Sequence, residues 1–407
     1  MNKNKMLSSL ALATSLMVAA GTASAAKFSD NEIKIGVLGD MSGVYSTGFS
    51  GKGAVDAVQM AVDDFGGKID GKPIKVISGD HRNKADIASA TARQWIDQDH
   101  VDMIADLTNS AVGLAVQHLA NEKKVITINT GSASSDLTGK ACTKYGIHYG
   151  YDTYALPHGT ASAIVKNGGK KWYFITADYT FGHSLEANTA AVVKQNGGEI
   201  LGQSLAPLGT NDFSSYLLQA KASGAQIIGL ANAGNDTINA IQQAHEFNLT
   251  DSGVQLAGLL VLLSDVQGLG LQTAQGLLFT TAWYWDHDAA SRKWAERYMK
   301  KYDQAPTFPH AALYSATMTY LKAVKAAGTD NPDKVRAEMG KMKIDDFFAQ
   351  GGHIRPDGLL VHKMFLVQAK KPGQAKGKWD LLNVVREIPA NEAYPPISES
   401  VCPLDKM

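Results

Sequence analysis

The feature that most constrains this fold is an alternation of short apolar segments with segments of helical periodicity, which runs once and then restarts. In the first series, Ile33–Leu38 reads as a strand and Ser50–Phe65 carries apolar residues at the spacing of a helix face. The second series begins at Trp172–Ala177. Such alternation predicts parallel strands connected by helices. We therefore expect an α/β protein with two Rossmann-like lobes, each a mainly parallel sheet flanked by helices.

The remaining elements are predicted from the same patterns. The expected further strands are Pro73–Ser78, Val101–Leu107, Val125–Asn129, Glu199–Leu205, Gln226–Leu230 and Gln255–Leu260. Asp86 and Ser110 are each placed to cap the helix that they begin. After Trp283 the chain becomes helical, and two antiparallel strands are expected at 362–369 and 379–386.

The chain is long enough for two domains. It has 407 residues, more than one ordinary core accommodates, and no long Pro/Ser linker separates its halves. We expect an N-terminal lobe of residues 26–150 plus about 281–350, and a C-terminal lobe of residues 151–280 plus about 351–390. Residues 391–407 would form a surface tail. Several short crossings, a multi-strand hinge, would join the lobes.

The first 25 residues have the features of a secretory signal peptide. Lys3 and Lys5 precede an apolar run, and Ala23-Ser24-Ala25 is a small-x-small cleavage site. The alternative, a retained membrane anchor, is disfavoured because the apolar run is too short. We expect an exported protein, cleaved near Ala25.

Charge and cysteine content narrow the possible partners. The chain carries 39 basic and 39 acidic residues, so no basic field favours nucleic acid. Cys142 and Cys402 are the two cysteines. In an oxidising compartment a disulfide between them is favoured over two free thiols.

A glycine-rich stretch from Gly39 to Gly67 raises the question of phosphate binding. Gly51-Lys52 is followed by Gly53 rather than Ser or Thr, so the P-loop pattern fails. The dinucleotide fingerprint fails as well, because Gly39 and Gly43 are four apart. We expect no nucleotide cofactor, and a loop that lines a ligand site instead.

Small polar residues follow two successive strands, at Thr108–Ser110 and at Asn129–Ser135. They either cap helices or bind a small anion at the carboxyl ends of the strands, where ligands bind in open α/β sheets. Loop aromatics have a similar pair of interpretations. Tyr45, Phe49, Tyr154, Tyr179, Phe181 and Trp283 either stack on a flat ligand or pack within an interface.

Hydrolase and metal motifs are lacking in this sequence. It contains no Gly-x-Ser-x-Gly elbow and no His-Glu-x-x-His, and its 11 histidines have no metal-ligand spacing. We therefore expect neither catalysis nor a metal or cofactor, and keep an exported α/β enzyme only as an alternative.

Seven segments together resemble one family, the branched-chain amino acid type of ABC-transporter substrate-binding proteins with the type I periplasmic binding fold. The segments, in chain order, are IKIGVLGDMSG, GKGAVDAVQMAVDDFGG, VDMIADLTNSAVGLAVQ, INTGSASSDLTG, ITADYTFGHSLE, TNDFSSYLLQAKASGAQII and AALYSATMTYLKAVKAAGTDN. The resemblance implies a periplasmic, non-enzymatic monomer that closes two lobes on a ligand and delivers it to an ABC permease. A sensory binding protein is the alternative.

The resemblance also implies where the ligand lies. The first lobe would hold its carboxylate and the second would close through the loop at Asp178–Gly182. The residues expected to bind ligand are Tyr45, Phe49, Thr108, Asn109, Ser110, Gly131, Ser132, Ala133, Ser134, Tyr154, Tyr179, Phe181, Asn232, Asp236 and Trp283.

The ligand class is inferred from a missing charge. Amino-acid binders of this family usually place an acidic residue against the ligand's ammonium, but the strand end at Ala257–Leu263 has none. Asp236 either substitutes for it or caps a helix. Since a buried ammonium without a counter-charge is costly, we expect an aromatic or related organic acid, with a branched-chain amino acid or amide as the alternative. The segments YDTYALPHGTA and CPL also resemble the aromatic-acid branch of the family.

Overall fold

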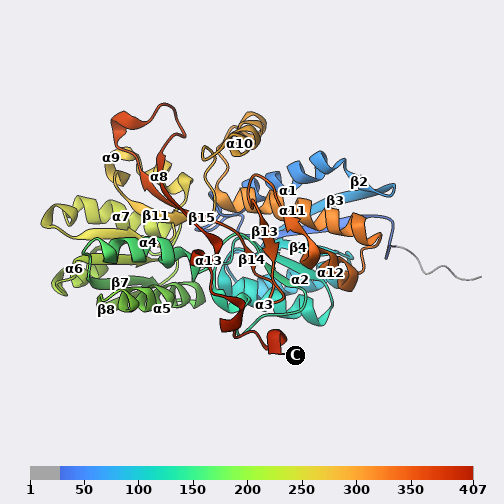
Figure 1. Cartoon of the computed structure of the whole chain (residues 1–407), viewed down its shortest axis with the longest axis horizontal. Helices are drawn as coiled ribbons and strands as arrows, with labels where there is room; N and C mark the ends of the chain where they lie inside the picture. Colours follow the sequence, from blue (N-terminus) through green and yellow to red (C-terminus); the bar gives the residue numbers. More distant parts are fainter. Residues whose placement is uncertain (1–27, 407) are drawn as a thin grey trace, which may run out of the picture.

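Two lobes lie side by side in the computed structural model, which describes residues 28–406 (Figure 1). The predicted signal peptide falls outside the described residues. Within the described part of the chain, no helix combines the length and the apolar character that crossing a membrane would require.

The first lobe contains a six-stranded sheet. Its strands are β1 (Ile33–Gly39), β2 (Lys68–Ile69), β3 (Lys72–Asp80), β4 (Met103–Asp106), β5 (Ile126–Asn129) and β6 (Gly146–His148). Their order is β2-β3-β1-β4-β5-β6, and β2 alone pairs antiparallel. The helices of this lobe are α1 (Gly51–Phe65), α2 (Ala85–Asp97), α3 (Ser110–Glu122), α10 (Ala289–Tyr302), α11 (Phe308–Ala327) and α12 (Pro332–Lys341). The parallel arrangement expected from the sequence is confirmed.

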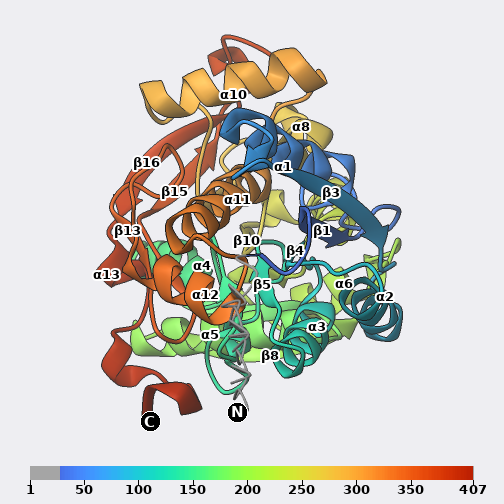
Figure 2. The same ribbon diagram turned by 90° about the vertical axis from the view of Figure 1, so that its right-hand side faces the viewer.

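Helices cover both faces of this sheet (Figure 2). α1 packs against α11 on one face, and α2 packs against α3 on the other. Strand residues alternate between the two cores, so Ile35 packs toward α1 and α11 while Leu38 packs toward α2 and α3. Gly36 is required on the second face, because a Cβ there would lie 2.6 Å from the ring of Trp95.

The second lobe contains two sheets. Its strands are β7 (Lys171–Ala177), β8 (Glu199–Ala206), β9 (Ile227–Ala231), β10 (Gln255–Gly258), β11 (Leu278–Thr281), β15 (Met364–Ala369) and β16 (Leu382–Ile388). The parallel sheet has the order β10-β9-β7-β8, and the antiparallel sheet has the order β11-β15-β16. The helices are α4 (Ala155–Lys166), α5 (Thr180–Gln195), α6 (Ser214–Ala222), α7 (Asn235–Glu246), α8 (Leu263–Leu269), α9 (Leu271–Ala274) and α13 (Ala390–Ala393).

The chain passes between the lobes three times before its tail begins. It crosses between β6 and α4, between β11 and α10, and again just before β15. The last crossing comes later than the expected position near 351. The short strands β12 (Lys343–Ile344), β13 (Gly352–Ile354) and β14 (Leu360–Val361) still belong to the first lobe, because Leu359 bridges to His148 of β6.

The C-terminal tail packs against the hinge and is bonded to the first lobe. Tyr394 is buried near the hinge, where its hydroxyl donates to the carbonyl of Gly150 at 3.4 Å. The expected disulfide is confirmed: Cys142 and Cys402 are bonded, with their Cα atoms 5.6 Å apart. The bond links the tail to the first lobe just beyond the polar loop that follows β5.

Replacing both cysteines by serine is expected to lower the free energy of unfolding by about 2–5 kcal/mol, because the bond restricts the unfolded chain. Differential scanning calorimetry would show this as a lower midpoint. A reductant should shift the wild-type midpoint in the same direction and leave the Cys142→Ser/Cys402→Ser variant unchanged. Equal midpoints for the two oxidised proteins would contradict the prediction.

Candidate functional site

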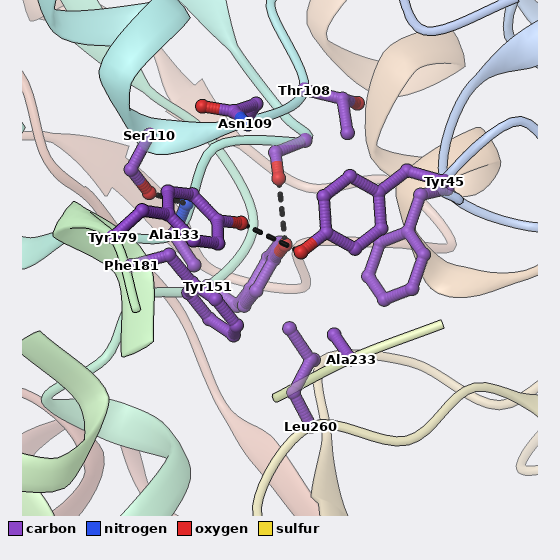
Figure 3. A pocket seen from close by; sticks show the side chains of 12 residues that line it. Tyr45, Thr108, Asn109, Ser110, Ala133, Tyr151, Tyr179, Phe181, Ala233 and Leu260 are labelled. Carbon is purple, nitrogen blue, oxygen red and sulfur yellow. Dashed lines mark hydrogen bonds between the residues drawn. The ribbon is translucent and has the colours of Figure 1, made fainter. Parts of the chain in front are cut away.

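A small cavity lies between the lobes at the carboxyl ends of their parallel strands (Figure 3). Its lining residues come from loops of both lobes: Tyr45, Phe49, Thr108, Asn109, Ser110, Gly131, Ala133, Tyr151, Tyr179, Phe181, Ala233 and Leu260. The space inside it, which includes space open to solvent, is about 220 Å³. The site therefore suits a small molecule.

Three tyrosines meet at the centre of this cavity (Figure 3). The hydroxyl of Tyr45, from the first lobe, lies 2.6 Å from that of Tyr179, from the second. The Tyr151 hydroxyl donates to the carbonyl of Gly131 at 2.9 Å. Burial raises the pKa of all three phenols above their usual range, so they remain neutral hydrogen-bonding groups. The Tyr45–Tyr179 contact holds the lobes together across the cavity.

The N-terminus of α3 forms the polar wall. Asn109 is the N-cap, and its side-chain oxygen accepts from the N–H groups of Ala111 at 3.0 Å and Val112 at 3.4 Å. The prediction that Ser110 caps this helix was therefore wrong, as was the one for Asp86, since α2 begins at Ala85 without a side-chain cap. The Ser110 N–H, at the first position of α3, has no acceptor within its own helix.

Hydroxyl groups around this wall differ in what they offer a ligand. Ser132 donates to the carbonyls of Leu107 and Asn109, and so braces the loop. Ser110 Oγ accepts from the N–H groups of Ala133 at 3.3 Å and Ser134 at 3.1 Å. Within the described residues, no hydrogen bond uses the proton of Ser110, so this hydroxyl remains available as a donor.

Ser134 and Thr108 also direct their hydroxyls to the protein. Ser134 Oγ accepts from the N–H of Asp136 at 3.3 Å and thereby caps a short 3₁₀ helix. Thr108 Oγ1 donates to Asp106 Oδ1 at 2.6 Å. Of the hydroxyls expected to hold a carboxylate, Ser110 alone faces the cavity with a proton to give, as far as residues 28–406 are concerned.

Asp106 is one residue near the site that the sequence analysis missed. It is fully buried at the end of β4, and burial raises its pKa to about 7 against the opposing effect of hydrogen bonds from Ser50 and Thr108. The signal available in the sequence was a lone carboxylate closing an apolar strand directly before Thr108. Tyr151, Ala233 and Leu260 line the cavity as well and were not among the expected residues.

Asp236 lies near the tyrosine pair without lining the cavity. Its side chain does not cap α7, whose N-cap is Gly234. Instead Asp236 Oδ2 accepts from the N–H of Gly209 at 3.1 Å, and Oδ1 has no partner among the described residues. Burial raises the pKa of Asp236 to about 6. Asn232, also buried, accepts a hydrogen bond from Thr237 at 2.7 Å.

Two of the expected aromatic residues lie elsewhere. Tyr154 stacks on His158, with ring centroids 4.1 Å apart, beside a different hollow near the tail. Trp283 is buried against α10, where its Nε1 donates to Ser291 at 2.9 Å. Both side chains therefore make their contacts within the protein and away from the cavity. The described residues also contain no group of three or more His, Cys, Asp or Glu side chains that could hold a metal ion.

Comparison with known proteins identifies the family. The model of a family described as periplasmic binding protein matches residues 32–377. The chain belongs to this family. A periplasmic binding protein from Burkholderia mallei is 52% identical, with a TM-score of 0.90 over 92% of this chain and 99% of that one. A branched-chain amino acid ABC transporter ligand-binding protein from Burkholderia xenovorans is 41% identical, with a TM-score of 0.82 over 92% and 100%.

More distant relatives are also similar to this chain. A Leu/Ile/Val-binding protein homologue of Brucella melitensis is 26% identical over 304 residues, 73% of this chain and 76% of that protein. A solute-binding protein of Rhodopseudomonas palustris, solved with 3,4-dihydroxybenzoic acid, is 23% identical with a TM-score of 0.80 over 89% and 98%. This periplasmic binding protein is thus of the ABC-transporter type that binds solutes and is not an enzyme.

Proposed function

We propose that this chain is the solute-binding component of an ABC importer and captures a small carboxylate, an aromatic or related organic acid. The observation that carries the proposal is the pairing of a helix N-terminus with a ring-lined cavity. The free Ser110 hydroxyl and the first N–H of α3 face the same space as Tyr45, Phe49 and Phe181. Such an end favours an anion, and the rings favour a flat apolar body.

Hinge closure supplies the binding mechanism in this proposal. As the lobes close, the carboxylate loses its water and receives donors from the protein in exchange. Tyr45 and Tyr179, which hydrogen bond to each other in the structure, would then turn to the ligand, so that each lobe contributes one phenol. The closed form would be what the permease recognises. The related Rhodopseudomonas protein, solved with an aromatic acid, shares this fold.

Export to the periplasm is part of the same proposal. The signal peptide, with cleavage near Ala25, is inferred from sequence, and family membership supports an exported protein. N-terminal sequencing of the protein recovered from a periplasmic fraction would test it: a first residue near Ala26 is expected, and an intact Met1 would contradict it.

A thermal-shift panel tests the ligand class. It would contain hydroxybenzoates, phenylpropanoids, 2-oxo acids, short amides and branched-chain amino acids. A ligand at about 100 times its dissociation constant stabilises the protein by roughly 2.7 kcal/mol, enough to move the unfolding midpoint by degrees. We expect a shift with the acids that lack an ammonium group. A shift with leucine or valine alone would contradict the proposal.

An amino-acid ligand is the second candidate, because Asp236 Oδ1 is buried and unpartnered near the tyrosine pair. That oxygen could accept from an ammonium. Asp236→Asn separates the two candidates, since it removes a negative charge at nearly constant shape. Affinity for an organic acid should be retained or increased in this variant, whereas affinity for an amino acid should fall at least tenfold. Isothermal titration calorimetry measures both.

A further inference from the structure

Asp106 connects the three first-lobe loops of the cavity, although it does not line the cavity itself. Its Oδ2 accepts from the Ser50 hydroxyl, and its Oδ1 accepts from Thr108. Its backbone carbonyl accepts from the N–H groups of Thr130 and Gly131, each at 3.1 Å. Ser50 follows β1, Thr108 follows β4, and Thr130 and Gly131 follow β5. One residue therefore meets every loop that the first lobe contributes.

The surroundings of Asp106 are shaped for its carboxylate. Ser50 stands at the N-cap position of α1, yet its hydroxyl caps nothing and goes to Asp106 instead. Gly39 and Gly131 keep the space open: a Cβ at Gly39 would overlap Asp106 Oδ2, and one at Gly131 would lie 2.8 Å from Oδ1. Asp106 itself adopts φ 76°, a conformation in which Asp and Asn are enriched among non-glycine residues.

The effect on the cavity is seen at Thr108. Because its hydroxyl donates to Asp106, it points away from the centre of the cavity (Figure 3). Thr108 thus contributes apolar surface to the lining, while Ser110 keeps a proton for a ligand. The carboxylate end and the apolar side of the cavity are therefore separated by the orientation of two neighbouring side chains.

We propose that Asp106 is the positioning residue of the ligand site: it fixes the three loops and turns the Thr108 hydroxyl away, so that the site selects an acid whose carboxylate lies at α3 and whose apolar body lies beside Thr108. This rests on the proposed function, in which the cavity between the lobes is the ligand site. Asp106 acts through Ser50, Thr108 and Gly131 and does not touch the ligand.

The charge of Asp106 gives the proposal a pH signature. Burial raises its pKa to about 7. The titratable groups that interact with it are Asp40 after β1 and Tyr151 at the hinge, and His81 after β3 contacts the backbone of Thr108. Burial lowers the pKa of His81 to about 4 and raises that of Tyr151 well above 10, so neither titrates near pH 7. Protonated Asp106, like an asparagine, could not accept from both hydroxyls at once, so affinity for an acid should weaken as the pH falls through 7.

Asp106→Asn tests the proposal, because asparagine tolerates the left-handed backbone at this position. Its amide cannot accept both hydroxyl protons at once. The matched control is Asp102→Asn directly before the same strand, where burial also raises the carboxyl pKa to about 7 and Oδ2 accepts from the N–H of Lys34 at 2.7 Å. The probe is 4-hydroxybenzoate, titrated by calorimetry from pH 5.5 to 8.5.

We expect at least a tenfold loss of affinity in Asp106→Asn at pH 7 and loss of the pH dependence centred near 7. Asp102→Asn should keep both the affinity and the pH profile. Wild-type affinity and an unchanged profile in Asp106→Asn would overturn the proposal. Asp236, with a pKa of about 6, adds the same pH dependence of affinity to all three proteins. A difference between their pH profiles therefore comes from Asp106.

A measurement without ligand keeps the two proposals apart. Hydrogen exchange of peptides covering 40–50, 107–110 and 130–134 should be faster in Asp106→Asn than in wild type or Asp102→Asn. Unchanged exchange in all three peptides overturns the positioning role whether or not the probe binds. Failure of wild type to bind any acid in the panel, together with faster exchange, would contradict the ligand class alone.

Discussion

Gly131→Ala is expected to abolish ligand binding while leaving the protein folded. A Cβ at this position would overlap the Thr108 hydroxyl and lie 2.8 Å from Asp106 Oδ1. Thr108 and Asp106 cannot move apart easily, because the Thr108 hydroxyl donates to Asp106. Residue 131 cannot shift easily either, because its carbonyl accepts from Tyr151. The strain would push the Thr108 side chain into the cavity, whose space is only about 220 Å³. The methyl group of Thr108 would then occupy space that the ligand needs.

Calorimetric titration with the best acid of the panel would measure the effect, which we expect to exceed a hundredfold loss of affinity. Overpacking of this kind typically costs about 1–3 kcal/mol of stability, so the thermal midpoint should fall by a few degrees. Gly373→Ala is the matched control, since a Cβ there would meet nothing within 4 Å. Binding at wild-type strength by Gly131→Ala would place the ligand away from the β5 loop.

Asp357→Ala should cause a large loss of stability although Asp357 lies outside the cavity. Arg355 and Asp357 form an ion pair between β13 and β14, with side chains 9% and 1% exposed. Arg355 also donates to the carbonyl of Pro395 in the tail at 2.7 Å. Removing Asp357 leaves a buried guanidinium without its partner, which costs about 3–5 kcal/mol.

Urea denaturation followed by tryptophan fluorescence would measure this loss as a lower midpoint. Glu392→Ala is the control, because the Arg386–Glu392 pair has similar geometry but side chains 43% and 42% exposed. It should cost no more than about 1 kcal/mol. The double variant Arg355→Met/Asp357→Leu should recover much of the stability, since it removes both charges. Equal midpoints for Asp357→Ala and Glu392→Ala would contradict the argument.

The fold could be predicted because periodic apolar patterns determine it. The strands Ile33–Leu38 and Trp172–Ala177 and the helix Ser50–Phe65 were predicted within a residue or two of their observed ends. These segments bury one face or both, and burial leaves a periodic trace in the sequence. Short elements such as β6 and β14 leave no such trace, because two or three residues do not define a period.

The candidate site was predicted only in part. Tyr45, Ser110 and Tyr179 were expected at the site because they follow parallel strands, whose carboxyl ends lie at one edge of the sheet. The direction in which a hydroxyl points depends on its partner, and the partner of Thr108 is a buried carboxylate. Trp283 shows the same limit, because its loop position did not reveal that its ring packs against α10.

The disulfide at the tail has a consequence for how the protein must be made. Cys402 lies beyond β16, the last strand of the second lobe, so the bond to Cys142 closes only when almost the whole chain is present. Contacts between such distant segments form late and slowly. A truncation before residue 402 would retain every residue that lines the cavity but lose the covalent fastening of the tail. Production in a reducing cytosol would cause the same defect without changing the sequence, so recombinant protein for binding studies should be made in an oxidising compartment.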